Sequence, residues 1–353
     1  MKSLKKTLLL SVTLVVNVTL FAQQSYYNGV NLSLVGAALK TELANKITST
    51  HTSFLTYTNV WAELKITDLD PTNANNVLLI YGYNDTDGSV INDRTRNKND
   101  NSGDVGDWNR EHTFAQSLAT PNMSTSSPNA GTDAHHLRSS DVQMNGNRGN
   151  RKFAAGSGNS ETTGANWYPG DEWKGDVARM MMYMYLRYPS QCIPTNVGTG
   201  SSVSLDDMLM LFINWNAEDP VSTYEEQRNT RLETSQGNRN PFIDNPYLAT
   251  AIWGGMDAEN TWPGTVSITE KEVTNSFLVY PTPSNTGNVH VFFDHTEEVE
   301  LLTIYTVNGQ VVRSIVNPYF ENNEFIISGL SAGFFVLKAV IGNTVLTKKV
   351  LVN

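Results

Sequence analysis

The stretch that decides the fold and the chemistry of this chain runs from Trp108 to Arg151. It contains three polar motifs, which read WNREH at 108–112, DAHHL at 133–137 and NGNRGNR at 145–151. These motifs bring together His, Glu, Asp, Asn and Arg, and they hold three of the six histidines in the chain. Hydrolysis of a phosphodiester needs a base near neutral pH, a hard cation and positive side chains. The clustering therefore indicates a hydrolytic phosphate site.

The residue types in these motifs suit three separate roles. The ordinary pKa of histidine is about 6.5, which suits a general base at neutral pH. Oxygen donors such as Glu111 and Asn145 suit Mg²⁺, and arginine binds phosphate through its planar fork. If Glu111 and His112 lie on an extended strand, their side chains point to opposite faces unless the strand bends or bulges there. The residues alone leave this question open.

Taken together, the motifs resemble those of the endonuclease I family of secreted and periplasmic nucleases, members of the ββα-metal or His-Me finger group. The resemblance is carried by REH at 110–112, DAHHL at 133–137, NGNRGN at 145–150, WKGDVAR at 173–179 and QGNRNPFID at 236–244. It covers most of residues 25–255 and implies an α+β lobe in which a ββα unit is surrounded by helices.

The resemblance also implies roles for particular residues. His112 would be the general base that activates water, while Glu111 and Asn145 would hold one Mg²⁺ or another divalent cation. Asn145 would project from the helix of the ββα unit. The implied reaction is hydrolysis of DNA, and often of RNA, with little sequence preference and with 5′-phosphate ends. The expected substrate contacts are Arg110, His135, Arg148 and Arg151.

One arginine role stays open. Some family members carry a product-stabilising arginine between the first two motifs, whereas residues 113–132 of this chain contain no basic side chain. Arg138, Arg148 or Arg151 are the candidates for that role. We further expect Arg148, Arg151 and Lys152 to form a local phosphate-binding strip, because phosphate contacts are what position a nucleic acid.

Outside the motifs, charge and composition set limits on the chain. Its 353 residues carry a formal net charge of −10, and residues 23–265, with 17 basic and 27 acidic side chains, also carry −10. Broad neutralisation of phosphates by Lys and Arg is therefore excluded. Residues 1–22 combine three lysines with an apolar stretch and a small residue at the end, which predicts a secretory signal peptide. The single cysteine, Cys192, excludes an internal disulfide.

The periodicity of the chain predicts helix over residues 23–65 and a strand over 77–81, with a loop over 92–106. A helix over 174–188 is expected to end at Pro189. Ser204 followed by Asp207 resembles a capping box that opens a second helix over 204–216.

The last part of the chain changes to short β-rich runs about ten residues apart, which predicts a small all-β, immunoglobulin-like sandwich over 279–353 after a linker at 265–278. VYPTP at 279–283, IYTVNGQ at 304–310, GLSAG at 329–333 and KKVLV at 348–352 resemble the C-terminal sorting domain of the type IX secretion system. The alternative is a carbohydrate- or matrix-binding module. Phe292, Phe334 and Phe335 alternate as core residues would, which disfavours an exposed sugar platform.

The sequence therefore predicts an exported, Mg²⁺-dependent, non-specific endonuclease at residues 23–264, followed by a sorting domain. We expect a monomer that is secreted or held at the cell surface, with no membrane span in the mature protein. Two alternatives remain. One is a non-catalytic nucleic-acid-binding or adhesion protein that retains the nuclease fold, and the other is a glycosidase that uses carboxylates such as Glu111 and Asp133.

Overall fold

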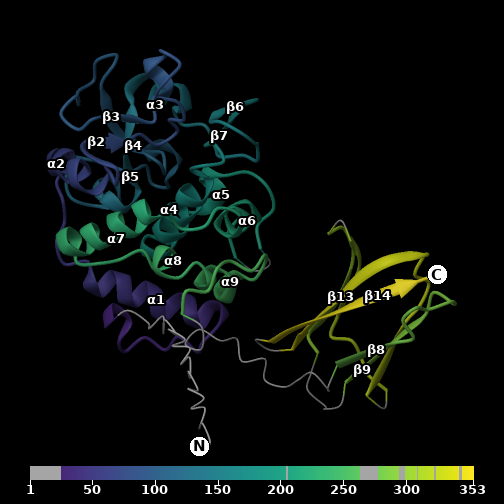
Figure 1. Cartoon of the computed structure of the whole chain (residues 1–353). Helices are drawn as coiled ribbons and strands as arrows, with labels where there is room; N and C mark the ends of the chain where they lie inside the picture. The colour runs from purple at the N-terminus through teal and green to yellow at the C-terminus, as the bar shows by residue number, and fades with distance from the viewer. Residues whose placement is uncertain are drawn as a thin grey trace, which may run out of the picture.

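The computed structural model describes residues 25–203, 206–262, 277–293, 299–307, 309–321, 323–341 and 344–353. The predicted signal peptide lies outside these residues, as does most of the predicted linker. Helices and short strands alternate up to Trp262, and antiparallel strands alone follow from Phe277 (Figure 1). The buried apolar clusters keep the same division, since each draws its residues from one side of the linker only.

The first part of the chain is mixed α+β. Its helices are α1 Gly36–Thr50, α2 Tyr57–Thr67, α3 Val142–Arg148, α4 Lys174–Arg187, α5 Pro194–Val197, α6 Met210–Glu218, α7 Thr223–Gln236, α8 Pro241–Asp244 and α9 Tyr247–Trp253. Its strands are β1 Leu69–Asp70, β2 Asn73–Leu78, β3 Thr95–Asn97, β4 Trp108–His112, β5 Leu137–Asp141, β6 Glu161–Thr163 and β7 Asn166–Tyr168. They form small antiparallel sheets in the orders β1-β2-β3, β4-β5 and β6-β7.

Helix α4 is the central element of this lobe, as Figure 1 shows. Every residue from Gly175 to Leu186 is buried, and the helix packs against α1, α6 and α8. Its run of Met and Tyr at 180–185 is buried on every side, as suits a core helix, and its buried charges Asp176 and Arg179 are paired with other side chains. The prediction of a helix ending before Pro189 is confirmed.

A ββα unit positions the motifs. Strand β4 pairs antiparallel with β5 from Trp108↔Asp141 to His112↔Leu137. Helix α3 follows β5 directly, because Asp141 caps it by accepting hydrogen bonds from the backbone N–H groups of Gln143 (2.8 Å) and Met144 (2.9 Å). The helix contacts both strands, so the first and third motifs lie against each other.

Several predicted boundaries differ from the structure. Residues 51–56 separate α1 from α2, and β3 lies inside the predicted loop. The predicted strand at 77–81 ends at Leu78, since Leu79–Tyr81 form a buried turn in which Tyr81 has a φ of 75°.

The predicted capping box is also in a different place. Ser204 lies outside the described residues, and α6 begins only at Met210 without a side-chain cap. A capping box does form further along the chain, between Ser222 and Glu225, where it begins α7.

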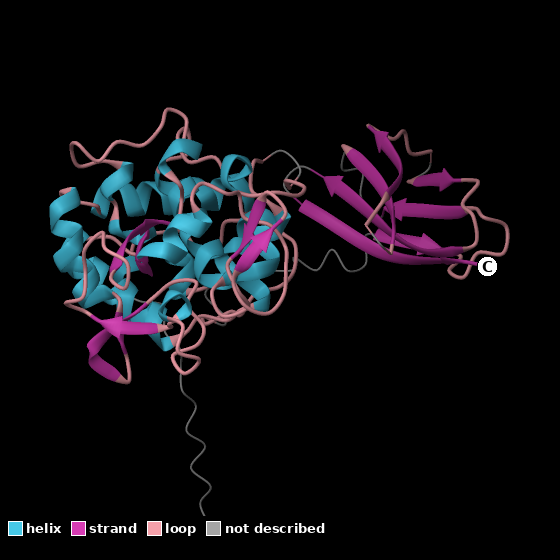
Figure 2. Ribbon diagram, turned by 90° about the horizontal axis from the view of Figure 1, so that it is seen from above, coloured by secondary structure: helices cyan, strands magenta, loops and turns pink. Residues whose placement is uncertain are grey.

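The last part of the chain consists of β8 Phe277–Tyr280, β9 Val289–Phe293, β10 Leu301–Thr306, β11 Val311–Val316, β12 Glu324–Ile327, β13 Gly333–Ile341 and β14 Thr344–Val352. They form two antiparallel sheets, in the orders β11-β10-β13-β14 and β12-β9-β8, and both sheets contribute to one core. Figure 2 shows the contrast between this all-strand part and the helix-rich part before it. Strand β8 begins two residues before the predicted start of the domain, and the sandwich type stays a prediction.

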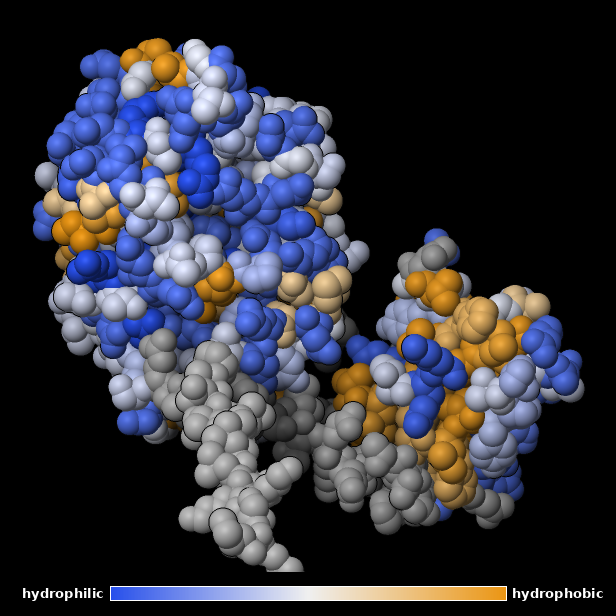
Figure 3. Space-filling view, viewed as in Figure 1, coloured by the Kyte–Doolittle hydropathy of each residue, from blue (hydrophilic) through white to orange (hydrophobic). Residues whose placement is uncertain are grey.

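The prediction that the three phenylalanines are core residues is wrong for two of them. Phe335 is buried, but Phe334 is 61% exposed and Phe292 lies outside the buried cluster. Consecutive residues of a strand face opposite sides, so Phe334 and Phe335 cannot share one face. Figure 3 shows apolar side chains on the face of this domain that is in view, and the exposed apolar residues of the domain include Val312, Val316, Tyr319 and Phe334.

Within the residues that the structure describes, no helix has both the length and the apolar character that crossing a membrane requires.

Candidate active site

Strand β4 presents its two motif residues on opposite faces, which answers the question that the sequence left open. On one face, Glu111 lies 3.2 Å from Nη1 of Arg148 in α3. Asn145, one turn earlier in α3, donates from Nδ2 to Oδ1 of Asn109 at 2.7 Å. Asn109 and Glu111 share a face by strand alternation, so Glu111 and Asn145 lie at the same β4–α3 interface.

Glu111 is a buried carboxylate with one oxygen occupied and one free. Its Oε1 accepts a hydrogen bond from the Tyr81 hydroxyl at 2.9 Å and faces Arg148. Its Oε2 accepts no hydrogen bond from any residue that the structure describes. Burial raises the pKa of Glu111 to about 7, although Arg148 and the Tyr81 hydrogen bond both lower it. The residue therefore ionises near neutral pH, which suits a ligand that binds a cation reversibly.

His112 lies on the other face of β4, with its ring held by the backbone. Its Nε2 is 2.8 Å from the carbonyl oxygen of Gly131, so Nε2 carries the proton and Nδ1 carries the lone pair. The Gln116 side-chain amide lies 2.9 Å from Nε2 and 3.3 Å from Nδ1. Burial, followed by the charge of His136, lowers the pKa of His112 to about 3. The imidazole is therefore neutral at physiological pH, with the lone pair of Nδ1 unprotonated.

The donors at the β4–α3 interface fit a hard divalent cation. A carboxylate oxygen of Glu111 and an amide oxygen of Asn145 are both ligands that Mg²⁺ prefers. Among the described residues no group of three or more His, Cys, Asp or Glu side chains is arranged to hold a metal. Mg²⁺ is commonly bound through only one or two protein carboxylates plus water and substrate phosphate, so two protein donors are compatible with it.

Arg148 is fully buried in the structure. Its guanidinium donates from Nη1 to the carbonyl oxygen of His112 (3.0 Å) and from Nη2 to that of Thr113 (2.8 Å), besides facing Glu111. Its exposed fraction is 0%, so the expected surface strip of three cations does not include it.

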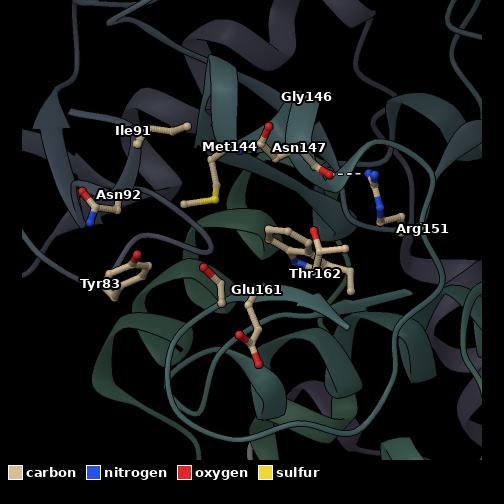
Figure 4. Close-up of a pocket in the computed structure, with 11 residues that line it drawn as sticks. Tyr83, Ile91, Asn92, Met144, Gly146, Asn147, Arg151, Glu161 and Thr162 are labelled. Carbon is tan, nitrogen blue, oxygen red and sulfur yellow. Dashed lines mark hydrogen bonds between the residues drawn. The ribbon is translucent and has the colours of Figure 1, made fainter. Parts of the chain in front are cut away.

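Arg151 and Lys152 are partly exposed and lie just beyond the end of α3. Figure 4 shows Arg151 turned back onto Asn147, to whose carbonyl oxygen Nη1 donates at 2.5 Å. Arg151 lines a polar pocket of about 370 Å³ together with Met144, Gly146 and Asn147, the neighbours of Asn145 in α3, and with Tyr83, Ile91, Asn92, Ser160, Glu161, Thr162 and Trp167. Lys152 instead donates to the carbonyl oxygen of Thr195 at 2.9 Å.

Arg110 lies on the same face of β4 as His112, between two aromatic rings. The carbon at the centre of its guanidinium is 3.5 Å from the ring centre of Tyr57 and 4.2 Å from that of Trp61. Its Nη1 donates to the carbonyl oxygen of Tyr57. Its Nη2 makes no hydrogen bond with the described part of the chain and is not among the fully buried polar atoms. One N–H edge of Arg110 is therefore available beside His112.

The second motif folds into the interior. His135 is 2% exposed, with Nε2 3.3 Å from the carbonyl oxygen of Asn238, and burial lowers its pKa to about 4. His136 is fully buried beside His112, with ring centres 5.5 Å apart. Asp133 accepts hydrogen bonds from the hydroxyls of Tyr183 (2.9 Å) and Tyr188 (3.0 Å). The structure therefore places the DAHHL motif in a buried polar network rather than at the surface.

The structure adds site residues that the motifs did not indicate, namely Tyr57, Tyr81, Gln116 and Gly131. Tyr81 reaches Glu111 from a turn with a φ of 75°, a conformation that costs a non-glycine residue free energy. None of these residues stands in a motif of its own, so the sequence offered no signal for them.

A pair of antiparallel strands and a helix hold a buried carboxylate, an amide oxygen and a neutral imidazole, which are groups that metal-assisted hydrolysis of a phosphodiester would use. The chain belongs to the Endonuclease I family, whose model matches residues 35–247. Residues 278–353 match the secretion system C-terminal sorting domain, so the resemblance seen in the sequence is confirmed for both parts.

Two curated relatives support the assignment. The chain is 43% identical to an extracellular ribonuclease of Bacillus amyloliquefaciens over 231 residues. This aligned segment covers 62% of this chain and 74% of the relative. It is 42% identical over 242 residues to an extracellular ribonuclease of Bacillus subtilis (strain 168), which is 65% of this chain and 78% of the relative.

Proposed function

We propose that the protein is an exported, divalent-metal-dependent endonuclease of the ββα-metal, or His-Me finger, type that hydrolyses RNA and DNA. The observation that carries the proposal is the neutral His112 imidazole, fixed by Gly131, next to Glu111 at the end of β4. Because His112 is the last residue of β4, a phosphate placed at this end of the strand can meet both the imidazole and a cation at the β4–α3 interface. The names of the relatives, both extracellular ribonucleases, favour RNA as one substrate. Family membership favours DNA as another.

His112 acts as the general base in this proposal. With Nε2–H bonded to the Gly131 carbonyl, Nδ1 accepts a proton from the attacking water, which takes the place of the Gln116 amide. The water oxygen bonds to phosphorus and the P–O3′ bond breaks; the leaving O3′ takes a proton from solvent water, which leaves a 5′-phosphate and a 3′-hydroxyl, and His112 then returns its proton to solvent. Such proton transfer contributes about 10²- to 10⁴-fold to a rate.

Glu111 and Asn145 would hold one divalent cation, with Mg²⁺ the best match to their oxygen donors. When bound, the cation supplies positive charge to the phosphoryl oxygens and the leaving oxygen as negative charge develops there. Arg148 lowers the pKa of Glu111 against the effect of burial and holds the carboxylate in place, and Arg110 offers its free N–H edge to phosphate. Arg151 is the remaining candidate for a phosphate contact, from the rim of the pocket beside α3.

The export route follows from the two ends of the chain. We propose that residues 1–22 are a signal peptide, that residues 23–264 form the catalytic domain, and that residues 279–353 direct passage through the type IX secretion system. The mature protein is then a secreted or surface-held monomer. The tail would be an immunoglobulin-like sandwich, which its two sheets and shared core favour.

The test is cleavage of plasmid DNA and of RNA by the purified protein, with Mg²⁺ and with EDTA. We expect cleavage that EDTA abolishes, and a loss of about 100-fold or more in His112→Ala. His290→Ala, which changes a half-buried histidine of the tail, is the matched control and retains full activity. Cleavage that survives EDTA, or wild-type cleavage by His112→Ala, would overturn the proposal.

A further inference from the structure

The acidic lobe raises the question of what binds the substrate next to His112. Residues 23–265 carry a net charge of −10, and Arg148, one of the few cations near the site, is fully buried. Counterion release from phosphates therefore supplies little affinity here. Stacking of bases on aromatic rings is a source of affinity that does not depend on a basic groove.

Two aromatic side chains of α2, Tyr57 and Trp61, lie along the face of β4 that carries Arg110 and His112. Tyr57 lies against the His112 ring with centres 5.5 Å apart, and Trp61 lies 5.2 Å from Trp108 of the same strand. Both rings also contact the Arg110 guanidinium. We call Phe54, Tyr57, Trp61 and Arg110 the aromatic edge.

Phe54 is the open member of the aromatic edge. One face of its ring stacks on His51, with centres 4.5 Å apart and planes 23° from parallel. Its side chain is nevertheless 53% exposed. Phe54 precedes Tyr57 by three positions, so their Cα atoms lie within about 11 Å of each other. That distance is of the order of one or two nucleotides.

The two ends of the aromatic edge match the two parts of a nucleotide. The free face of Phe54 suits a base, and the Nη2 edge of Arg110 suits a phosphate oxygen. Because two rings hold the guanidinium, Arg110 loses little side-chain entropy on binding. In a duplex each base is stacked between its neighbours, whereas an unpaired base can turn out onto a ring.

We propose that the aromatic edge is a binding site for unpaired nucleotides, with a base on Phe54 and the adjoining phosphate on Arg110. The enzyme then prefers single-stranded RNA or DNA over duplex. This inference rests on the proposed function, because that function places the nucleic acid beside His112. The binding step itself does not need catalysis.

The test measures binding without cleavage. The full mature chain carrying His112→Ala is titrated in EDTA with a fluorescein-labelled oligothymidylate and with the same strand annealed to its complement. Phe54→Ala should raise the Kd for the single strand by about 5- to 150-fold, which corresponds to the loss of one base–aromatic stack. The Kd for the duplex should change by less than about twofold.

Three variants separate stacking from other causes. Phe54→Leu keeps the apolar bulk without the aromatic face and should behave like Phe54→Ala, whereas Phe54→Trp should restore binding. Tyr319→Ala, at an 83% exposed aromatic residue of the tail, is the matched control and should bind as before. Arg110→Lys should weaken binding of both probes, because a lysine cannot stack or present a planar fork.

The outcomes distinguish this inference from the proposed function. Equal losses for single strand and duplex in Phe54→Ala, or no loss at all, would overturn the inference and leave the nuclease assignment standing. The opposite result has two parts: single-strand binding depends on Phe54, and the wild-type protein shows no metal-dependent cleavage. That result would retain the inference and overturn the catalytic proposal.

Discussion

Arg148 Nη1 lies 3.2 Å from Oε1 of Glu111, and the two side chains are 1% and 3% exposed. The last turn of α3 thus supplies the counter-charge for the carboxylate of β4. Arg148→Met would leave that carboxylate buried and unpaired, and it would also remove the hydrogen bonds to the carbonyls of His112 and Thr113. We expect a loss of about 3–5 kcal/mol in the free energy of unfolding, measured by urea denaturation in EDTA.

The Glu111→Gln change tests whether the cost comes from the unpaired charge. In the Arg148→Met background it should recover part of the lost stability, so the two changes should be strongly non-additive. Additive losses would show that Arg148 stabilises the fold through its carbonyl contacts alone.

The pKa of Glu111 predicts how activity depends on pH and metal together. Burial raises this pKa to about 7, so the carboxyl is protonated at lower pH and is then a poor ligand. Cation affinity should fall as the pH falls through about 7. The cation binds the ionised form, so raising the Mg²⁺ concentration should move the acid limb of the kcat/KM profile to lower pH. If the pH of the acid limb does not change with the Mg²⁺ concentration, the assignment of Glu111 as a ligand is contradicted.

Tyr81→Phe tests the same carboxylate from its other side. The Tyr81 hydroxyl donates to Oε1 at 2.9 Å, and this hydrogen bond lowers the pKa of Glu111. Without it we expect the acid limb at fixed low Mg²⁺ to move up by about one pH unit. Tyr168→Phe, which removes a tyrosine hydroxyl bonded to Asp171 instead, is the control and should leave the limb in place.

Asp133 distinguishes the nuclease from the glycosidase alternative, which would use Glu111 and Asp133 as its carboxylate pair. Both oxygens of Asp133 are occupied, by Tyr183, Tyr188, Gln236 and the backbone of His135. Asp133→Asn should therefore cost about 1–3 kcal/mol of unfolding free energy, with little change in cleavage per folded molecule. A folded variant with activity lowered about 100-fold or more would instead give Asp133 a catalytic role.

The sequence predicted the motifs and their family better than it predicted where their side chains lie. REH and the Asn of NGNR do meet, at β4 and α3, because a ββα unit brings these segments together. Arg148 and His135 are as polar as Arg151 in the sequence, yet they are buried and Arg151 is not. Burial depends on packing between segments distant in the chain, and a motif records only residue type.

The same limit applies to secondary structure. The helix at 174–187 and the strands of the tail were predictable because their composition is uniform over many residues. Strand β3 and the turn at Tyr81 are short, and they are fixed by contacts such as Arg96 with Asp141 (2.7 Å) and Tyr81 with Glu111. Local pattern carries no signal for elements that tertiary contacts impose.

The division of the chain into two cores predicts what removal of the tail would do. The buried clusters of the first part end at Trp262, and that of the tail begins at Phe277. A chain ending at residue 262 should therefore fold by itself. When both proteins are purified, it should unfold at the same midpoint as the first part of the full-length protein, and its cleavage rate should be within about twofold. The same truncation should abolish release of nuclease activity into the medium by a host with type IX secretion, because the sorting domain is missing. Fusing residues 263–353 to an unrelated exported protein should carry that protein out of the cell. If the fusion protein stays inside while the truncated nuclease is still released, the export signal lies in the catalytic domain instead.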